Sequence, residues 1–156
     1  MIEIDVPGYR KLQLDHLVMD YNGTIAKDGH IINGVKEALT GLSDQLKLHV
    51  LTADTFGKVE SEIKGISCEL FILSSGNQAF GKLSYVKNLN CERTVCIGNG
   101  RNDRLMLRES ALGIAVILEE GAAMETLLSA DVVCPSILSA LELLTNPLRL
   151  TATLRS

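Results

Sequence analysis

Short apolar runs recur along the chain, and each one ends in polar or turn-forming residues. An apolar run bounded in this way predicts a buried strand, because strands covered on both faces lack a polar side. The predicted strands are Leu17–Asp20, Lys47–Leu51, Leu70–Leu73, Thr94–Ile97, Leu112–Ile117 and Asp131–Val133. Weaker alternation on either side of Pro7-Gly8 predicts a small hairpin or edge strands between Ile2 and Leu14.

Between these runs, apolar residues recur three or four positions apart, which is typical of amphipathic helices. The helical positions are Val35, Leu39 and Leu42; Phe56, Val59 and Ile63; Phe80, Leu83, Val86 and Leu89; Leu105 to Leu107; Met124, Leu127 and Leu128; and Ile137, Leu138, Leu141 and Leu144. We expect Pro147 to end the last helix and to leave a tail from Arg149 to Ser156. Strands that alternate with helices predict right-handed βαβ units. We therefore expect an α/β, three-layer Rossmann-like fold with a mainly parallel central sheet, with residues 1–156 as a single domain.

The composition is that of a globular chain and argues against nucleic acid and membrane partners. Hydrophobic residues make up 46% of the 156 residues and charged residues 22%. The net charge of -4 and the aromatic content of 4% argue against nucleic acid as a partner. The sequence has no apolar run of roughly 20 residues and no basic segment at Met1–Asp5, so we expect no membrane partner and a cytoplasmic location. The four cysteines form no C-x-x-C pair, and we expect reduced thiols.

Polar residues that could carry chemistry follow the ends of four predicted strands. Asp20 comes directly after Leu17–Met19, and Thr52 follows the second strand. The regions Ser74–Lys82 and Asn99–Asp103 follow the third and fourth strands. Because carboxyl ends of parallel strands meet at one edge of a sheet, we expect these residues to converge. A carboxylate at such an edge can attack phosphorus or hold a metal ion.

Plainer roles stay open for several of these residues. Thr52 could simply cap a helix, because threonine is a good helix cap. Lys82 could be a solvated helix residue, in which case Lys87 could be the lysine of the site instead. The glycines at 98 and 100 can be turn formers alone. Three basic residues at helical spacing more often form a solvated face than a phosphate site: Arg101, Arg104 and Arg108.

Taken in order, these motifs resemble the haloacid dehalogenase-like (HAD) superfamily, and within it the phosphorylation domain of P-type ATPases and its soluble relatives. Asp20-Tyr21-Asn22-Gly23-Thr24 is similar to their Asp-Lys-Thr-Gly-Thr, and Leu51-Thr52-Ala53-Asp54 resembles their Thr-Gly-Asp. Lys82 precedes a helical stretch as their lysine does, and Gly98–Asp103 resembles Gly-Asp-Gly-x-Asn-Asp. The resemblance covers roughly Leu17 to Val133 and implies a HAD-like fold.

The resemblance also implies roles for individual residues. Asp20 would be the nucleophile that is transiently phosphorylated. The implied catalytic residues are Asp20, Asn22, Thr52 and Lys82. The implied phosphate-binding residues are Gly23, Thr24, Thr52, Ala53, Lys82 and Asn102. The implied cofactor is Mg²⁺, and its ligands would be Asp20, Asn22 through its backbone carbonyl, Asn99 and Asp103.

Two positions depart from the pattern of the superfamily. Asn22 stands where most of its phosphatases have an aspartate that donates and accepts protons, which an amide cannot do. Slow turnover or a long-lived phosphoenzyme is therefore expected. Asn99 stands where the family has a metal-binding aspartate, so magnesium affinity should be weaker, with Asp103 carrying more of the load.

The spacing of the motifs leaves no room for a cap domain. Both gaps between the first three motifs are about 30 residues, the ordinary size of a βαβ unit. An uncapped site would take selectivity from a large substrate, a partner protein or a neighbouring subunit, so we expect a homo-oligomer, in which the tail Leu148–Ser156 could reach a site. The sequence thus favours a Mg²⁺-dependent phosphohydrolase that acts on a phosphorylated small molecule or phosphoprotein. The alternative is a catalytically impaired module that binds phosphate or a protein partner.

Overall fold

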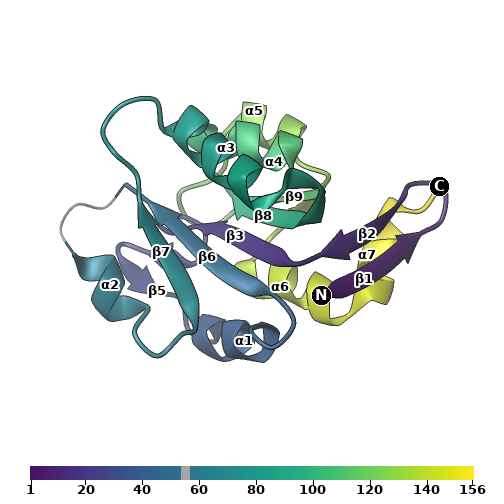
Figure 1. Cartoon of the computed structure of the whole chain (residues 1–156), viewed down its shortest axis with the longest axis horizontal. Helices are drawn as coiled ribbons and strands as arrows, with labels where there is room; N and C mark the ends of the chain where they lie inside the picture. Colours follow the sequence, from purple (N-terminus) through teal and green to yellow (C-terminus); the bar gives the residue numbers. More distant parts are fainter. Residues whose placement is uncertain (54–56) are drawn as a thin grey trace.

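A six-stranded parallel sheet forms the centre of the structure, a computed structural model that describes residues 1–53 and 57–156. The strand order is β10-β9-β8-β3-β6-β7, and all neighbours pair in parallel (Figure 1). The strands are β3 (His16–Asp20), β6 (Lys47–Thr52), β7 (Cys68–Ile72), β8 (Thr94–Gly98), β9 (Leu112–Val116) and β10 (Val132–Cys134). The predicted α/β class with a parallel central sheet is confirmed.

Helices cover both faces of this sheet, which gives the three predicted layers (Figure 1). One face carries α3 (Gln78–Leu89), α4 (Arg104–Glu109) and α5 (Met124–Ser129). The other face carries α1 (Val35–Leu42), α2 (Lys58–Glu62) and α6 (Ile137–Thr145). Two short 3₁₀ turns, η1 (Cys91–Arg93) and η2 (Arg101–Asp103), precede β8 and α4.

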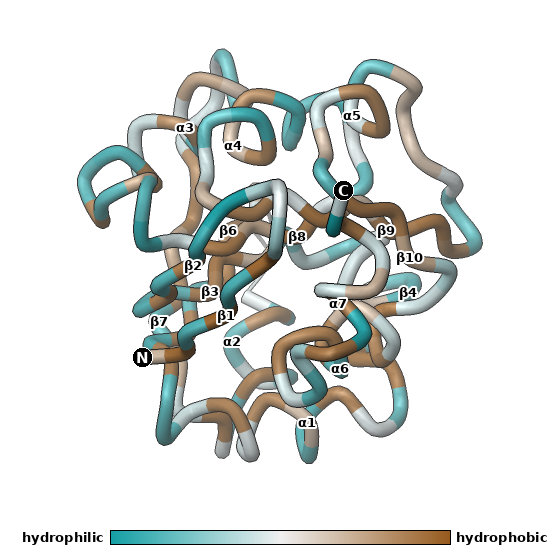
Figure 2. The backbone as a smooth tube through the Cα atoms, turned by 90° about the vertical axis from the view of Figure 1, so that its right-hand side faces the viewer, coloured by the Kyte–Doolittle hydropathy of each residue, from teal (hydrophilic) through white to brown (hydrophobic). Residues whose placement is uncertain are grey.

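The two faces of the sheet bury different side chains of the same strands. Leu17 and Met19 of β3 belong to the larger core, which includes residues of α1 and α6, whereas Val18 packs on the side of α3 and α4. This alternation follows from the two-residue period of a strand. Figure 2 shows hydrophobic stretches of the backbone along central strands such as β8 and β9 and along α6. Each fully buried apolar side chain contributes about 1.5–3 kcal/mol, so the core holds the carboxyl ends of the strands in place.

Two small hairpins stand beside the main sheet. The predicted N-terminal hairpin is present as β1 (Ile2–Val6) and β2 (Arg10–Leu14). The turn that the sequence indicates at Asp28-Gly29 closes a second hairpin, β4 (Ala26–Lys27) and β5 (His30–Ile31), directly after the first motif.

The C-terminal segment differs from the prediction. Pro147 does not merely end α6; it begins α7 (Pro147–Leu154), because proline is well suited to the first turn of a helix. Helix α7 packs against β1, and the backbone N–H of Ser156 donates to the carbonyl of Pro7 at 3.1 Å. Figure 1 shows this helix and the β1–β2 hairpin together at one end of the molecule. The segment is therefore a docked helix, which corrects the expectation of a free tail.

Some predicted apolar positions are exposed. Phe80 in the first turn of α3 is 58% exposed, and Leu128 in α5 is 81% exposed. In α5 the buried residue is Thr126, whose hydroxyl donates to the carbonyl of Gly100 at 2.6 Å. Phe56 lies outside the described residues. Among the helices of residues 1–53 and 57–156, none is long and apolar enough to cross a membrane.

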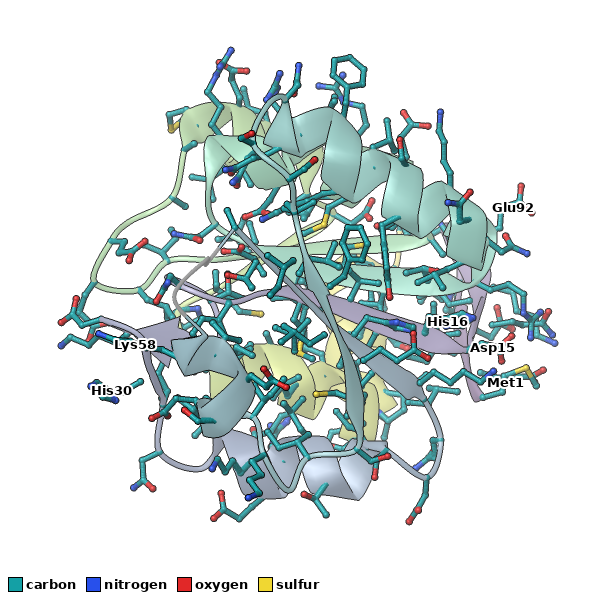
Figure 3. The ribbon with its side chains drawn as sticks, turned by 60° about the vertical axis from the view of Figure 1, so that its left-hand side comes forward. Met1, Asp15, His16, His30, Lys58 and Glu92 are labelled. Carbon is teal, nitrogen blue, oxygen red and sulfur yellow. The ribbon has the colours of Figure 1, made fainter. Side chains whose placement is uncertain are left out.

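A chain of polar rings lies at the amino end of the central strands. The Nδ1 atom of His16 lies 3.0 Å from Nε2 of His49, and Nδ1 of His49 lies 2.9 Å from the hydroxyl of Tyr85. The His49 side chain is 1% exposed, and burial lowers its pKa to about 4. The carboxylate of Glu69, 3.6 Å from His49, only partly opposes this effect. Figure 3 shows His16 beside Asp15 and Met1, on the side of the molecule away from His30.

The buried His49 should make the fold sensitive to acid. Its pKa is about 4 in the folded chain, below the ordinary value of 6.5. Between these two pH values the unfolded chain therefore binds a proton that the folded chain does not bind. We expect the free energy of unfolding to fall by about 3 kcal/mol as the pH drops from 6.5 toward 4. Urea unfolding across this range should show a smaller loss for His49→Gln. The exposed His30→Gln provides the control, and equal pH dependence in all three proteins would contradict this assignment.

Candidate active site

The predicted residues converge at the carboxyl edge of the sheet. Asp20 ends β3, Thr52 ends the neighbouring β6, and Gly98 ends β8 on the other side. Helix α3 brings Lys82 to the same edge. A pocket of about 720 Å³ opens there, lined by Asp20, Asn22, Thr52, Ala53, Lys82, Asn99, Gly100, Arg101, Asn102 and Glu120. One cavity therefore gathers residues from five separate segments of the chain.

A buried ion group forms the floor of this pocket. The Lys82 ammonium lies 2.7 Å from Oδ1 of Asp20 and 2.6 Å from Oδ1 of Asp103. The Lys82 side chain is 1% exposed, so it is not a solvated helix residue, whereas Lys87 is exposed. Burial alone would lower the pKa of Lys82, but the two carboxylates together outweigh it and raise that pKa above its ordinary value. Lys82 therefore stays a cation beside the predicted nucleophile.

Asp103 is enclosed by its own loop. Its Oδ2 accepts the backbone N–H groups of Asn99 at 3.0 Å and Gly100 at 2.9 Å, while its Oδ1 accepts from Lys82. Gly98 makes this packing possible, since a Cβ there would lie 2.5 Å from Cγ of Asp103. Gly98 is therefore more than a turn former. Both oxygens of Asp103 therefore accept hydrogen bonds, and its Oδ1 positions the Lys82 ammonium.

Gly23 and Thr24 lie in the turn that follows Asp20. Gly23 has a φ of +82°, and its N–H donates to the carbonyl of Ala26 at 2.9 Å. The N–H of Thr24 donates to Tyr21 at 3.2 Å. The Thr24 hydroxyl lies 3.3 Å from both Oδ2 of Asp20 and Oδ1 of Asn99. These two N–H groups have acceptors inside the turn, and the phosphate-binding role of Gly23 and Thr24 stays a prediction.

Other predicted phosphate-binding residues do face the pocket. Thr52 is buried and lines it together with Ala53. Asn102 accepts from Lys82 at 3.5 Å and donates to the side chain of Gln78 at 2.7 Å, which holds its amide over the floor. Asp54, the last residue of the second motif, lies outside the described residues.

Asn22 bridges the pocket and the second hairpin. Its Oδ1 accepts the N–H of Gly29 at 3.0 Å, while the residue lines the pocket. Within the basic stripe, Arg101 lines the pocket, and Arg101 and Arg104 both pair with Glu125, at 2.9 Å and 3.3 Å.

The oxygen donors at this edge suit a weakly held magnesium ion. Oδ2 of Asp20 and Oδ1 of Asn99 approach the same hydroxyl of Thr24, so both point to one region. Within residues 1–53 and 57–156, no three His, Cys, Asp or Glu side chains are grouped as metal ligands. A cation here would be held by the Asp20 carboxylate together with amide and backbone oxygens and water. Mg²⁺ accepts such a set, because it binds hard oxygen ligands and keeps several waters.

Glu120 also lines the pocket, although the sequence reasoning did not single it out. It is an exposed carboxylate in the turn between β9 and α5. A signal was available, because Glu120 closely follows the predicted strand Leu112–Ile117, and that strand ends at the same edge of the sheet.

Comparison with solved structures defines the class of the fold. 3-Deoxy-D-manno-octulosonate 8-phosphate phosphatase from Moraxella catarrhalis, in complex with magnesium ion, phosphate ion and KDO, is 17% identical, with a TM-score of 0.68 over 90% of this chain and 92% of that chain. The cobalt-bound form of the corresponding Haemophilus influenzae phosphatase is 15% identical, with a TM-score of 0.65 over 80% and 79%. The catalytic domain of the CPx-ATPase CopB-B is 24% identical, with a TM-score of 0.58 over 74% and 46%. The chain has the capless HAD-like fold.

Sequence comparison supplies the family. No known family model matches the chain. It is 44% identical over 84 residues to the uncharacterized protein MJ0073 of Methanocaldococcus jannaschii, a match that covers 51% of this chain and 90% of that protein. It is 51% identical over 39 residues to the uncharacterized protein MJ0072 of the same organism, covering 25% and 89%. The chain belongs to the same family as these two proteins.

Proposed function

We propose that this protein is a metal-dependent phosphohydrolase that acts through an aspartyl phosphate on Asp20. The observation that carries the proposal is the position of Asp20, at the floor of an open polar pocket and 2.7 Å from a buried ammonium group. The fold of known phosphatases supports it. A carboxylate beside a fixed cation can approach a phosphate dianion that it would otherwise repel.

The residues of the pocket would divide the work as follows. A carboxylate oxygen of Asp20 attacks phosphorus, and the bond from phosphorus to the leaving oxygen breaks with its electron pair. Lys82 and Asn102 stabilise the charge that develops on the phosphoryl oxygens. The leaving oxygen takes a proton from solvent, because Asn22 cannot supply one. Water then attacks the phosphorus of the acyl phosphate, which releases inorganic phosphate and restores the Asp20 carboxylate.

Magnesium would complete the neutralisation of the phosphate. When bound, it supplies positive charge that lowers repulsion between the phosphate and Asp20. Asp20, the backbone carbonyl of Asn22 and Oδ1 of Asn99 would hold it. Asp103 would contribute to the same site, while its Oδ1 keeps Lys82 in place.

A second candidate is a phospho-accepting module with little turnover. The observation that favours it is the side chain of Asn22, an amide that accepts from Gly29 and has no acid or base to offer. Such a protein would be phosphorylated on Asp20 and keep the group. Release of phosphate over many turnovers separates the enzyme from this module.

The test of the proposed function is Asp20→Asn. We expect Mg²⁺-dependent phosphate release from p-nitrophenyl phosphate by the wild type, and a loss of roughly 10³-fold or more in the variant, because the nucleophile is gone. Asp44→Asn, an exposed change away from the pocket, should leave the rate unchanged. Unaltered release by Asp20→Asn would overturn the proposal.

The size of the pocket supports a proposal for the substrate class. The pocket has the volume for a drug-sized ligand and carries polar groups from several segments. We propose a phosphorylated small molecule as substrate, in line with the phosphatase of similar fold that acts on a sugar-acid phosphate. A phosphoprotein substrate, homo-oligomerisation and a cytoplasmic location stay predictions.

A further inference from the structure

The turn that carries Glu120 is fastened to Asn99. The Nδ2 of Asn99 donates to the carbonyl of Gly121 at 3.0 Å, and the carbonyl of Asn99 accepts the N–H of Ala123 at 2.9 Å. A carboxylate at position 99 could not make the first bond, because it has no N–H to donate. The side chain and the backbone of Asn99 therefore hold the segment that directly follows Glu120.

Glu120 reaches over Gly23 toward the Asn99 amide. A Cβ built on Gly23 would lie 2.5 Å from Oε2 of Glu120, 2.6 Å from Nδ2 of Asn99 and 2.8 Å from its Oδ1. The absence of a side chain at position 23 leaves this space open. The carboxylate of Glu120 thus lies next to the amide oxygen that would help to hold a cation.

The ion group at the pocket has a net negative charge even before Glu120 is counted. Two carboxylates, Asp20 and Asp103, share the single positive charge of Lys82, which leaves one negative charge. Arg101 also lines the pocket, but its guanidinium pairs with Glu125 at 2.9 Å. A divalent cation would therefore meet one uncompensated negative charge without Glu120 and two with it.

We propose that Glu120 supplies the negative charge that Asn99 lacks at the cation site. This inference rests on the proposed function only for the location of the cation. Its carboxylate acts through a water of the ion or by direct contact, since Mg²⁺ keeps several waters. Glu119, the preceding residue, cannot do the same, because it faces Lys27 at 3.3 Å and lines a different cavity.

The experiment measures magnesium affinity directly. Mg²⁺ as the chloride salt is titrated calorimetrically into the wild type, Glu120→Gln and Glu120→Lys, with Glu119→Gln and Glu119→Lys as matched controls. Salt near 0.15 M screens the change in overall charge. We expect a roughly ten- to a hundredfold loss of affinity in Glu120→Gln, a greater loss in Glu120→Lys and little change in the controls. Thermal unfolding without magnesium should be the same for all five proteins, since Glu120 is exposed.

The outcomes separate this inference from the proposed function. Equal Mg²⁺ affinity in Glu120→Gln and the wild type would overturn the role of Glu120. Equal losses at positions 119 and 120 would overturn it too, because they would show a general charge effect. Phosphate release that disappears in Asp20→Asn would still support the phosphohydrolase in either case. Magnesium binding that depends on Glu120 in a protein without phosphate release would support the inference and refute the phosphohydrolase.

Discussion

Replacing Lys82 by Met should destabilise the protein by about 3–5 kcal/mol and abolish phosphate release. The variant keeps most of the side-chain volume but removes the only cation that contacts Asp103 among the described ion pairs. Asp103 is fully buried, and its charge would be left next to that of Asp20. Breaking a buried pair by removing one partner usually costs this much, because the remaining charge stays desolvated. Urea unfolding followed by circular dichroism measures the change.

Lys87→Met is the matched control for this experiment. Lys87 lies on the same helix and is exposed, so its replacement should change the free energy of unfolding by less than about 0.5 kcal/mol. A Lys82→Met protein as stable as the wild type would contradict the buried ion group. Losses of equal size in both variants would do so as well.

Asn22→Asp should raise the rate of phosphate release by about 10²-fold. The new carboxylate can protonate the leaving oxygen and later take a proton from water, and such help is typically worth about 10² to 10⁴. We expect the lower end, because Gly29 donates to this side chain and would favour the ionised form. Single-turnover kinetics with p-nitrophenyl phosphate should show faster formation and faster loss of the phosphoenzyme.

Asn33→Asp controls for the added charge. Asn33 lies near the second hairpin and lines another cavity, so its variant should release phosphate at the wild-type rate. If Asn22→Asp is no faster than Asn33→Asp, then proton transfer does not limit this site. Formation of a stable phosphoenzyme in the wild type alone would instead favour the phospho-accepting module.

The sequence was sufficient to predict the sheet and the edge at which the site lies. Apolar runs ending in Asp20, Thr52 and Gly98 define strands whose carboxyl ends must meet, and they do meet in the structure. The apolar spacing of Phe80, Leu83, Val86 and Leu89 also predicted the helix that carries Lys82. Its burial could not be predicted from spacing, because it depends on the contact with Asp103 from a later loop.

The differences arise where a tertiary contact decides the use of a residue. Asp103 is buried beside Lys82, whose ammonium lies 2.6 Å from its Oδ1. Glu120 belongs to no motif, and although it follows a predicted strand, its contact with the space over Gly23 is a tertiary one. Pro147 begins a helix because α7 has β1 to pack against. Local preference could not predict these three results, since each partner is distant in the sequence.

The central place of β3 has a kinetic consequence. This strand pairs with β6 on one side and with β8 on the other, and β8 follows much later in the chain. During translation, most of the polypeptide must be synthesised before β3 can pair with a strand on each of its two edges. Pairing of such remote segments is slow, and until it occurs hydrophobic surface and an unpaired strand edge stay exposed. Nascent chains truncated before β8 should therefore depend on chaperones to avoid aggregation.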